Sequence, residues 1–306
     1  MFGFKEAWMI FVKGLAMGAA DVVPGVSGGT VAFITGIYER LLNAIRQINF
    51  PAIQIWRKQG LKAAWDHIDG NFLLILFSGI MTSILSLAKI VSWLLEHHQL
   101  LVWSLFSGLI LASAWHISKQ IKTWSAASWI SLALGCGFSL LVSQLSPASI
   151  DVQNYYYFFA GMIAICAMIL PGISGSFILL ILGMYHPLLT AVNQLQISAL
   201  ALFAGGALIG LLSFSHLLSY LLKRWHNPSY AVLTGFLLGS LSLLWPWKQV
   251  VSTYTSSEGI EKPLQQMNIL PTQYAQLLQQ DPQTLSCVAL MLLGVVFIVV
   301  LERKSN

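Results

Sequence analysis

Two short stretches of the sequence place proline, glycine and small polar residues inside otherwise apolar segments. The first, PGVSGGT, covers residues 24–30, and the second, PGISGSF, covers residues 171–177. Proline ends a helix and glycine permits unusual backbone geometry, so each stretch predicts a break between two helical arms. Non-helical backbone at membrane depth must be covered by protein or line a wet cavity, because an unpaired N–H in hydrocarbon is costly. We therefore expect each break to be buried and polar.

The residue types at these breaks favour the binding of an anion. Ser27 and Ser174 are each placed to N-cap the arm that follows the break. The free N–H groups at the start of such an arm, together with its partial positive charge, suit a phosphate. The predicted phosphate-binding residues of the breaks are Ser27, Gly28, Gly29, Thr30, Ser174, Gly175 and Ser176. A simpler alternative is that these small residues only allow two turns to pack closely.

Four charged residues near the breaks are further candidates for function. Arg40 and Lys89 are cations that can contact a phosphate. Alternatively, Arg40 is only an anchor at the membrane interface, and Lys89 extends its side chain to the membrane surface. Asp21 is the carboxylate expected at depth beside a break. It is a candidate for coupling to H⁺ or Na⁺, or else a local acceptor that stabilises the hairpin. Glu39 is the second coupling candidate.

The composition indicates an integral membrane protein. Hydrophobic residues make up 57% of the chain and charged residues only 9%, with a mean hydropathy of +0.74. Soluble domains have about a quarter of their residues charged. The 16 basic residues exceed the 11 acidic ones, but they form no compact patch with aromatics, which argues against nucleic acid as a partner. The three cysteines lie apart in apolar runs and indicate neither disulfides nor a metal site, and no cofactor is expected.

The apolar segments predict six membrane spans and two broken hairpins. Regions 4–47 and 155–195 contain the breaks and are predicted to enter and leave the membrane on one side, each as a re-entrant helical hairpin or a pair of short helices. The predicted spans are 71–95, 100–118, 126–145, 198–222, 229–247 and 285–301. With this topology thirteen of the 16 Lys and Arg residues lie on the cytoplasmic side, as the positive-inside rule requires. Both termini are then cytoplasmic, and a polar loop at 248–284 is outside.

The second half of the chain repeats the first. A shift of 147 residues aligns nine identical residues in nineteen positions around the two breaks. Three spans follow each hairpin, and because this number is odd, the second copy must be inverted relative to the first. The sequence therefore predicts an all-α polytopic membrane protein with an inverted-topology repeat, residues 1–146 and 155–306. Such repeats are typical of alternating-access transporters.

The motif GAADVVPGVSGGTVAFITGIYERLL and its later copy PGISGSFILLILGMY resemble the PopT polyprenyl-phosphate transporter family of bacteria. The resemblance spans essentially the whole chain. It implies translocation of undecaprenyl phosphate from the outer to the inner leaflet of the cytoplasmic membrane, for reuse of this carrier lipid in cell-envelope synthesis. It implies a lipid transporter and no enzyme. The second copy has Met168, Phe177 and Pro187 where the first has Asp21, Thr30 and Arg40, so the two breaks should contribute unequally.

Two other functions fit parts of the pattern. A small-anion secondary transporter or channel would use the same breaks for a water-soluble ligand. An intramembrane hydrolase would use Ser27 as nucleophile, but the serine recurs at Ser174, and the sequence contains neither an HExxH motif nor a phosphatase-like cluster of Arg, His and Ser. The coupling ion, the oligomeric state and the role of the outer loop are left open by the sequence. The expected partners are undecaprenyl phosphate and membrane lipids.

Overall fold

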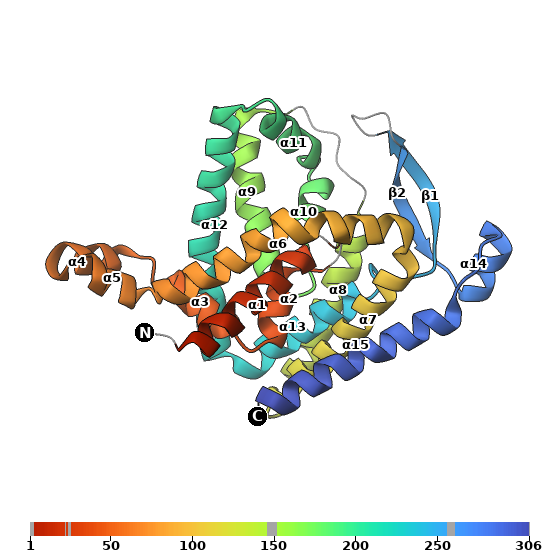
Figure 1. The fold of residues 1–306 in the computed structure, drawn as a ribbon, viewed down its shortest axis with the longest axis horizontal. Helices are drawn as coiled ribbons and strands as arrows, with labels where there is room; N and C mark the ends of the chain where they lie inside the picture. The colour runs from red at the N-terminus through yellow and green to blue at the C-terminus, as the bar shows by residue number, and fades with distance from the viewer. Residues whose placement is uncertain (1–2, 22, 24–25, 146–151, 256–260, 306) are drawn as a thin grey trace.

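Helices make up most of the chain that the computed structural model describes, namely residues 3–21, 23, 26–145, 152–255 and 261–305 (Figure 1). A helix pairs its own backbone groups, which is why apolar segments adopt this form in a bilayer. Four helices are long and apolar enough to cross a membrane, and they match four predicted spans. They are α6 (Gly70–His97), α7 (Gln99–Ser118), α8 (Ala126–Gln144) and α12 (Ile197–Arg224). The prediction of a helical polytopic membrane protein is confirmed.

The two other predicted spans are also helical, but one is shorter than expected. Helix α15 (Thr284–Ser305) has 22 residues, whereas α13 (His226–Ser240) has only 15. The predicted end of the latter span at residue 247 is wrong, because the helix stops at Ser240 and is followed by turns. Pro246 prevents the helix from reaching residue 247, since proline lacks the N–H that a helix needs and keeps the residue before it out of helical geometry.

The segment predicted as a polar outer loop, 248–284, contains regular structure instead. It forms an antiparallel hairpin of β1 (Lys248–Thr255) and β2 (Glu261–Asn268), followed by α14 (Pro271–Leu278). Two indole N–H groups fasten this region to the end of α13. Trp245 Nε1 donates to the carbonyl oxygen of Ile269 at 2.8 Å, and Trp247 Nε1 donates to that of Pro282 at 2.8 Å.

Each predicted hairpin consists of three helices, because the arm after the break is itself bent. The first hairpin contains α1 (Phe4–Asp21), α2 (Gly28–Ile34) and α3 (Tyr38–Arg46), and the second contains α9 (Asn154–Ile169), α10 (Gly175–Ile181) and α11 (Tyr185–Asn193). The prediction of one continuous second arm is wrong. Gly36 and Gly183 adopt φ of 72° and 69°, which only glycine adopts without strain, and α10 and α11 meet at 107°. Pro24 and Gly25 of the first break lie outside the described residues.

Four helix pairs make up the body of the protein, and each is closely packed through glycine. Helix α1 packs on α6, α9 on α12, α7 on α15, and α8 on α13, and the first two pairs lie side by side in Figure 1. In each pair a Cβ added to a glycine would overlap a carbonyl oxygen of the partner helix: Gly14 with Leu76, Gly161 with Phe203, Gly108 with Met291, and Gly135 with Val232. Small residues permit the close backbone approach that drives helix association in membranes.

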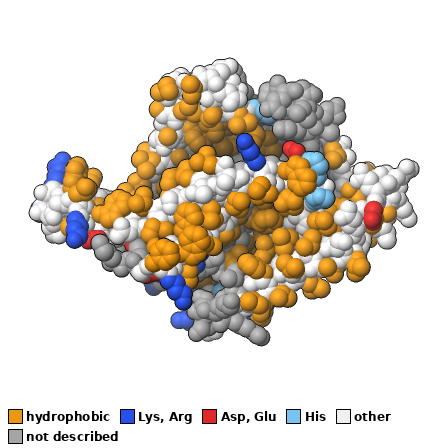
Figure 2. Space-filling model, in the orientation of Figure 1, with side chains coloured by type: hydrophobic (Ala, Val, Ile, Leu, Met, Phe, Trp, Pro, Cys, Tyr) orange, Lys and Arg blue, Asp and Glu red, His pale blue; other side chains and the backbone are white. Residues whose placement is uncertain are grey.

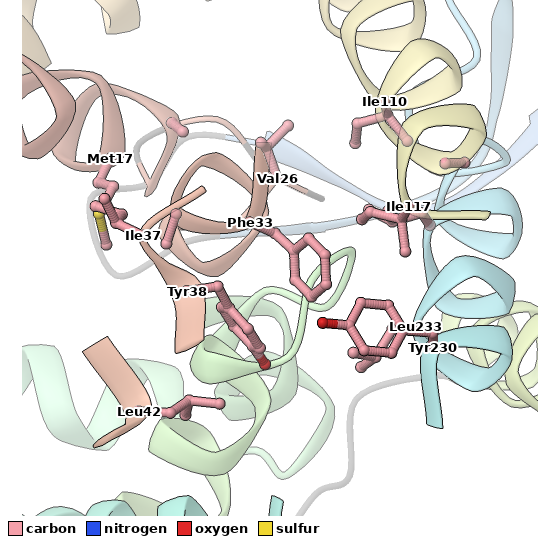
Figure 3. Packing of buried hydrophobic residues seen from close by; sticks show 14 of the residues in the cluster. Met17, Val26, Phe33, Ile37, Tyr38, Leu42, Ile110, Ile117, Tyr230 and Leu233 are labelled. Carbon is pink, nitrogen blue, oxygen red and sulfur yellow. The ribbon is translucent and has the colours of Figure 1, made fainter. Parts of the chain in front are cut away.

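The largest cluster of buried apolar residues joins the first hairpin to helices of both halves. Figure 3 shows Phe33 of α2 between the rings of Tyr38 of α3 and Tyr230 of α13. The ring centroids of Phe33 and Tyr38 are 4.7 Å apart, and those of Phe33 and Tyr230 are 5.7 Å apart in an edge-to-face arrangement. Ile110 and Ile117 of α7 belong to the same cluster. This packing fixes α2, and with it the first break, against α7 and α13.

Two glycines on α8 provide a matched test of the helix packing. In Gly135→Ala the new methyl group collides with the backbone of α13, whereas a Cβ at Gly137 meets no atom within 4 Å. We expect Gly135→Ala to lower the free energy of unfolding by about 1–3 kcal/mol, the usual cost of overpacking. Gly137→Ala should be neutral or slightly stabilising, because alanine favours a helix. Thermal unfolding of both purified variants in detergent measures this, and equal midpoints would contradict the packing described.

Candidate functional site

The two chain breaks lie against each other, and hydrogen bonds connect them. The N–H of Gly172 donates to Thr30 Oγ1 at 3.0 Å, and the hydroxyl of Ser27 donates to the carbonyl oxygen of Leu170 at 3.1 Å. Ser27 and Thr30 are each only 1% exposed. The predicted meeting of the two breaks is therefore seen in the structure, and the contact is polar and buried.

The end of α9 is satisfied by side chains of the other half of the chain. The last carbonyl groups of a helix have no partner within it. Here Tyr38 OH donates to the carbonyl oxygen of Ile169 at 3.1 Å, next to the bond from Ser27 to Leu170. A Cβ on Gly29 would overlap this same Ile169 carbonyl oxygen. Glycine is thus required at position 29 for α2 to approach the end of α9, as the close-packing interpretation predicts.

The chain's own oxygen atoms occupy two of the donors at the first break. The N–H of Gly28 donates to Asp21 Oδ1 at 2.6 Å, and the N–H of Thr30 donates to Ser27 Oγ at 3.3 Å. Ser27 therefore caps α2 as predicted. Asp21 makes the local contact expected of an acceptor that stabilises the hairpin. Its carboxylate stands where an anion would otherwise bind to the Gly28 amide.

The second break is organised differently from the first. Ser174 occupies the N-cap position of α10 as predicted, but its side chain makes no capping hydrogen bond, so the expected capping contact is absent. Its hydroxyl instead lies 2.9 Å from that of Ser176, which is exposed. Gly175 packs against the carbonyl oxygen of Ala164 within the same hairpin. The exposed hydroxyl of Ser176 therefore remains available to a ligand at the edge of the junction, whereas Ser174 is buried.

The structure places Arg40 and Lys89 apart from these contacts. Arg40 binds Asp69 through two nitrogens, at 2.7 and 3.2 Å, and its NH1 lies 3.6 Å from Glu6. Its guanidinium also lies 4.4 Å from the ring centroid of Phe72. Arg40 thereby ties α3 to the starts of α1 and α6. Lys89 is exposed on α6.

The coupling candidate Glu39 connects the first hairpin to the second half of the chain. Tyr230 OH of α13 donates to Glu39 Oε1 at 2.6 Å. The ring of His226 stacks on Tyr230 at a centroid distance of 4.5 Å. This contact and the contact between the two breaks both join α2 or α3 to the second half, so they would change together if the halves moved.

Sequence reasoning missed two residues that hold the first break in place. Lys13 Nζ donates to the carbonyl oxygen of Thr35 at 2.7 Å and so satisfies the end of α2. Tyr38 binds the end of α9, as described above. A signal for Tyr38 was present, because it is one of the residues repeated in the second copy, where Tyr185 matches it. Lys13 has no such counterpart.

Comparison with known proteins identifies the family of this chain. A family model described as undecaprenyl phosphate translocase-like matches residues 17–262. The chain belongs to this family. A polyprenyl-phosphate transporter of Vibrio cholerae is 49% identical over 296 residues, which cover 97% of this chain and 96% of the relative. A polyprenyl-phosphate transporter of Staphylococcus aureus is 28% identical over 257 residues, covering 78% and 86%.

The family assignment confirms the resemblance noted in the sequence. It also confirms the predicted class, a membrane transporter of lipid and not an enzyme, because the family is described as translocase-like and both relatives are named as transporters. No solved structure matches the chain. The contacts at the breaks therefore come from this structure alone.

Replacement of Thr30 tests the contact between the breaks. Thr30→Val keeps the shape of the side chain but leaves the buried N–H of Gly172 without its acceptor. An unsatisfied buried donor costs about 1–3 kcal/mol, so we expect a loss of stability of that size. Thr30→Ser retains the hydroxyl and should cost much less. Thermal unfolding in detergent compares the two variants, and an equal loss in both would show that the hydroxyl contact contributes nothing.

Proposed function

We propose that this protein moves undecaprenyl phosphate from the outer to the inner leaflet of the bacterial cytoplasmic membrane and so returns the carrier lipid to cell-envelope synthesis. Family membership and the names of both relatives support a polyprenyl phosphate as the substrate. The observation that carries the proposal is the buried polar contact between the two breaks, at Thr30 and Gly172. Hydroxyl and amide groups at such a place can replace the water that a phosphate loses on leaving the headgroup layer.

We further propose that residues 1–146 and 155–306 form an inverted-topology repeat. The helix pairs support this, because exchanging the two halves maps the pair α1–α6 onto α9–α12 and the pair α7–α15 onto α13–α8. An inverted repeat lets a site between the halves open to either side by the same motion. Both termini are cytoplasmic in this proposal, and the start of α1 and the end of α15 lie on the same lower side of the view in Figure 1.

The proposed path keeps the lipid tail in the bilayer while the phosphate passes between helices to the breaks. The unaided transfer of a charged group through hydrocarbon has a very high barrier. The breaks lower this barrier by offering the amides of Gly28 and Gly29 and the hydroxyls of Ser27, Thr30, Ser174 and Ser176. Lys89, exposed on α6, is proposed to contact the phosphate on entry. Arg40, beside the starts of α1 and α6, is proposed to contact it near the cytoplasmic side.

Transport by this path must separate the two breaks, and since the pairs α7–α15 and α8–α13 join the two halves, the moving bodies are helix pairs and not whole halves. The contacts that part are the bonds from Gly172 to Thr30, from Ser27 to Leu170 and from Tyr38 to Ile169. Each hydrogen bond of this kind contributes about 0.5–1.5 kcal/mol net. The loss of these bonds is offset when the phosphate takes the place of their acceptor atoms, or when the hydroxyl groups rotate and donate to the phosphate. The junction is thus tight enough to exclude water and weak enough to open.

Asp21 offers a route for coupling to protons. Its carboxylate and the substrate phosphate would compete for the same N–H of Gly28. When the phosphate takes this donor, the released carboxylate binds a proton from the side to which the cavity is open, and it gives the proton up when it returns to Gly28. Transport would then move a proton with each substrate cycle. Glu39, bound to Tyr230, is the second acidic group that changes surroundings when the halves move.

The two rival functions make different demands on the site. A hydrolase that used Ser27 would need a base beside it, but the described partners of the Ser27 hydroxyl are Thr30 and the Leu170 carbonyl oxygen. A carrier of small anions would transport inorganic phosphate and would be indifferent to lipid phosphates. Competition between these substrates separates the carrier of small anions from the lipid transporter.

Loss of the hydroxyls at the breaks should slow transport. In proteoliposomes with a fluorescent polyprenyl phosphate, a membrane-impermeant quencher reports how much lipid remains in the outer leaflet. We expect Ser27→Ala combined with Ser174→Ala to reduce the initial rate about tenfold, equivalent to about 1.4 kcal/mol in the barrier. Ser213→Ala, an exposed serine of α12 that bonds only within its own helix, is the control. A double variant as fast as this control would rule out the proposed site.

Replacement of the carboxylate tests coupling separately from binding. Asp21→Asn preserves an acceptor oxygen for the Gly28 amide but can no longer gain and lose a proton. We expect the variant to transport at a rate that no longer responds to an imposed pH gradient, while the wild-type rate changes with it. Glu96→Gln, at an exposed position of α6, is the matched control. Asp21 would have no coupling role if the variant responded to the gradient as the wild type does.

A further inference from the structure

Two short helices project from the body of the protein and have no buried residue. They are α4 (Phe50–Gln59) and α5 (Leu61–His67), which pack on each other and connect to the body where α5 meets α6. Figure 1 shows them extending sideways from the start of α6. Gly60, with φ of 88°, makes the turn between them. Their apolar side chains are therefore not explained by packing within the chain that the structure describes.

Five large apolar side chains are exposed on this helix pair. On α4 they are Phe50, Ile53 and Trp56, with 69%, 45% and 55% of their surface exposed, and their spacing of three residues places them along one face. On α5 they are Leu61 and Trp65, four residues apart and therefore also on one face. Exposed apolar surface of this extent normally marks a site of interaction with a membrane or a protein.

Basic residues accompany this apolar surface. Residues 50–67 contain Arg57, Lys58 and Lys62 but a single acidic residue, Asp66. Figure 2 shows blue basic and orange apolar side chains together on the projecting arm. Tryptophan with lysine and arginine is the combination found where helices lie at the boundary of headgroups and acyl chains. The positive charge is complementary to anionic phospholipids and not to another copy of the same basic arm.

The lengths of the two helices exclude a transmembrane position. At 1.5 Å per residue, helices of 10 and 7 residues reach about 15 Å and 10 Å, well below the roughly 30 Å of a hydrocarbon core. A short amphipathic helix can instead bury its apolar face to a depth of about 5–10 Å while its charges stay among the headgroups. The side of the membrane follows from the proposed topology, in which the segment between the first hairpin and α6 is cytoplasmic.

From these observations we infer that the α4–α5 pair is a lipid-binding element that lies in the headgroup layer of the cytoplasmic leaflet and binds anionic phospholipid. Phe50, Ile53, Trp56 and Leu61 enter the acyl boundary, and the basic side chains bind lipid phosphates. The cytoplasmic location rests on the proposed function, whereas the binding of lipid does not.

The position of this element connects it to the ion pairs of Arg40. Trp65 of α5 donates from Nε1 to Asn71 Oδ1 of α6 at 3.0 Å, and its ring covers Gly70. Asp69, the residue that binds Arg40 at 2.7 Å, lies between Trp65 and Asn71 in the sequence. A membrane contact that holds α5 therefore also holds the carboxylate that orients Arg40. Lipid binding at the arm would fix the cytoplasmic ends of α3 and α6 while other helices move.

Spin labels on adjacent residues of α4 test whether one face enters the membrane. In a variant whose three cysteines are replaced by alanine, labels are attached at Ile53→Cys and, as the matched control, at Gln54→Cys, which lies on the side of α4 that carries Lys58. The protein is reconstituted in vesicles of phosphatidylcholine with phosphatidylglycerol and without any polyprenyl phosphate. Collision with oxygen reports the acyl region, and collision with a water-soluble nickel complex reports the aqueous phase.

We expect the ratio of oxygen to nickel collisions to be roughly tenfold higher at position 53 than at position 54, as for an interfacial helix. In vesicles of phosphatidylcholine alone this difference should fall. Arg57→Gln combined with Lys58→Gln and Lys62→Gln should remove the dependence on anionic lipid. Equal, water-like ratios at both positions would overturn the proposal, as would a label at position 53 shielded from both reagents, which would indicate that protein covers this face.

A separate measurement distinguishes this proposal from the proposed topology. An impermeant thiol reagent added to intact cells should not modify Gln54→Cys if the arm is cytoplasmic. Modification from outside, together with a lipid-exposed label at position 53, would leave lipid binding intact and refute the proposed orientation. Normal protection with a water-exposed label at position 53 would refute lipid binding alone.

Discussion

Backbone groups that leave a helix inside a bilayer need partners from the protein, and this requirement governs the centre of the structure. The first break binds its own amides, those of Gly28 and Thr30, through Asp21 and Ser27. The second break relies on the first: the carbonyl groups at the end of α9 are bound by the hydroxyls of Ser27 and Tyr38, and the amide of Gly172 is bound by Thr30. Since hydrogen-bond partners in hydrocarbon are otherwise lacking, the first half of the chain stabilises the break of the second. In the proposed function this small, polar surface serves a phosphate only when the two breaks part.

The rest of the fold makes such motion feasible. Glycine contacts hold the helices of each pair so closely that their backbones touch, as at Gly108 and Gly135. The cluster around Phe33 fixes α2 against α7 and α13. The breaks are joined by a few hydrogen bonds, and the apolar side chains of Val26, Pro171 and Ile173 are buried there as well. Helix pairs therefore behave as stiff units, and the proposed opening occurs at the junction between the breaks.

Much of the architecture was predictable from the sequence because it follows from hydropathy and from repetition. The positions of both breaks, four spans and the cap at Ser27 were found in this way. Sequence patterns were insufficient where tertiary contacts determine the local structure or the partner of a side chain. The second bends occur at Gly36 and Gly183, which the repeat aligned but whose positive φ no sequence pattern specified. No sequence pattern identifies Asp69 as the partner of Arg40, because the two residues are 29 positions apart in the chain.

The central claim is that the breaks meet and must separate for the lipid phosphate to pass. A reversible cross-link measures this most directly: Ser27→Cys and Leu170→Cys are introduced in a background without the native cysteines and joined by mild oxidation or a short bifunctional thiol reagent. The account predicts that the cross-link forms readily and stops leaflet exchange of polyprenyl phosphate. Reduction of the cross-link should restore this exchange. A cross-linked protein that transports at the full rate, or a pair that never cross-links, would contradict it.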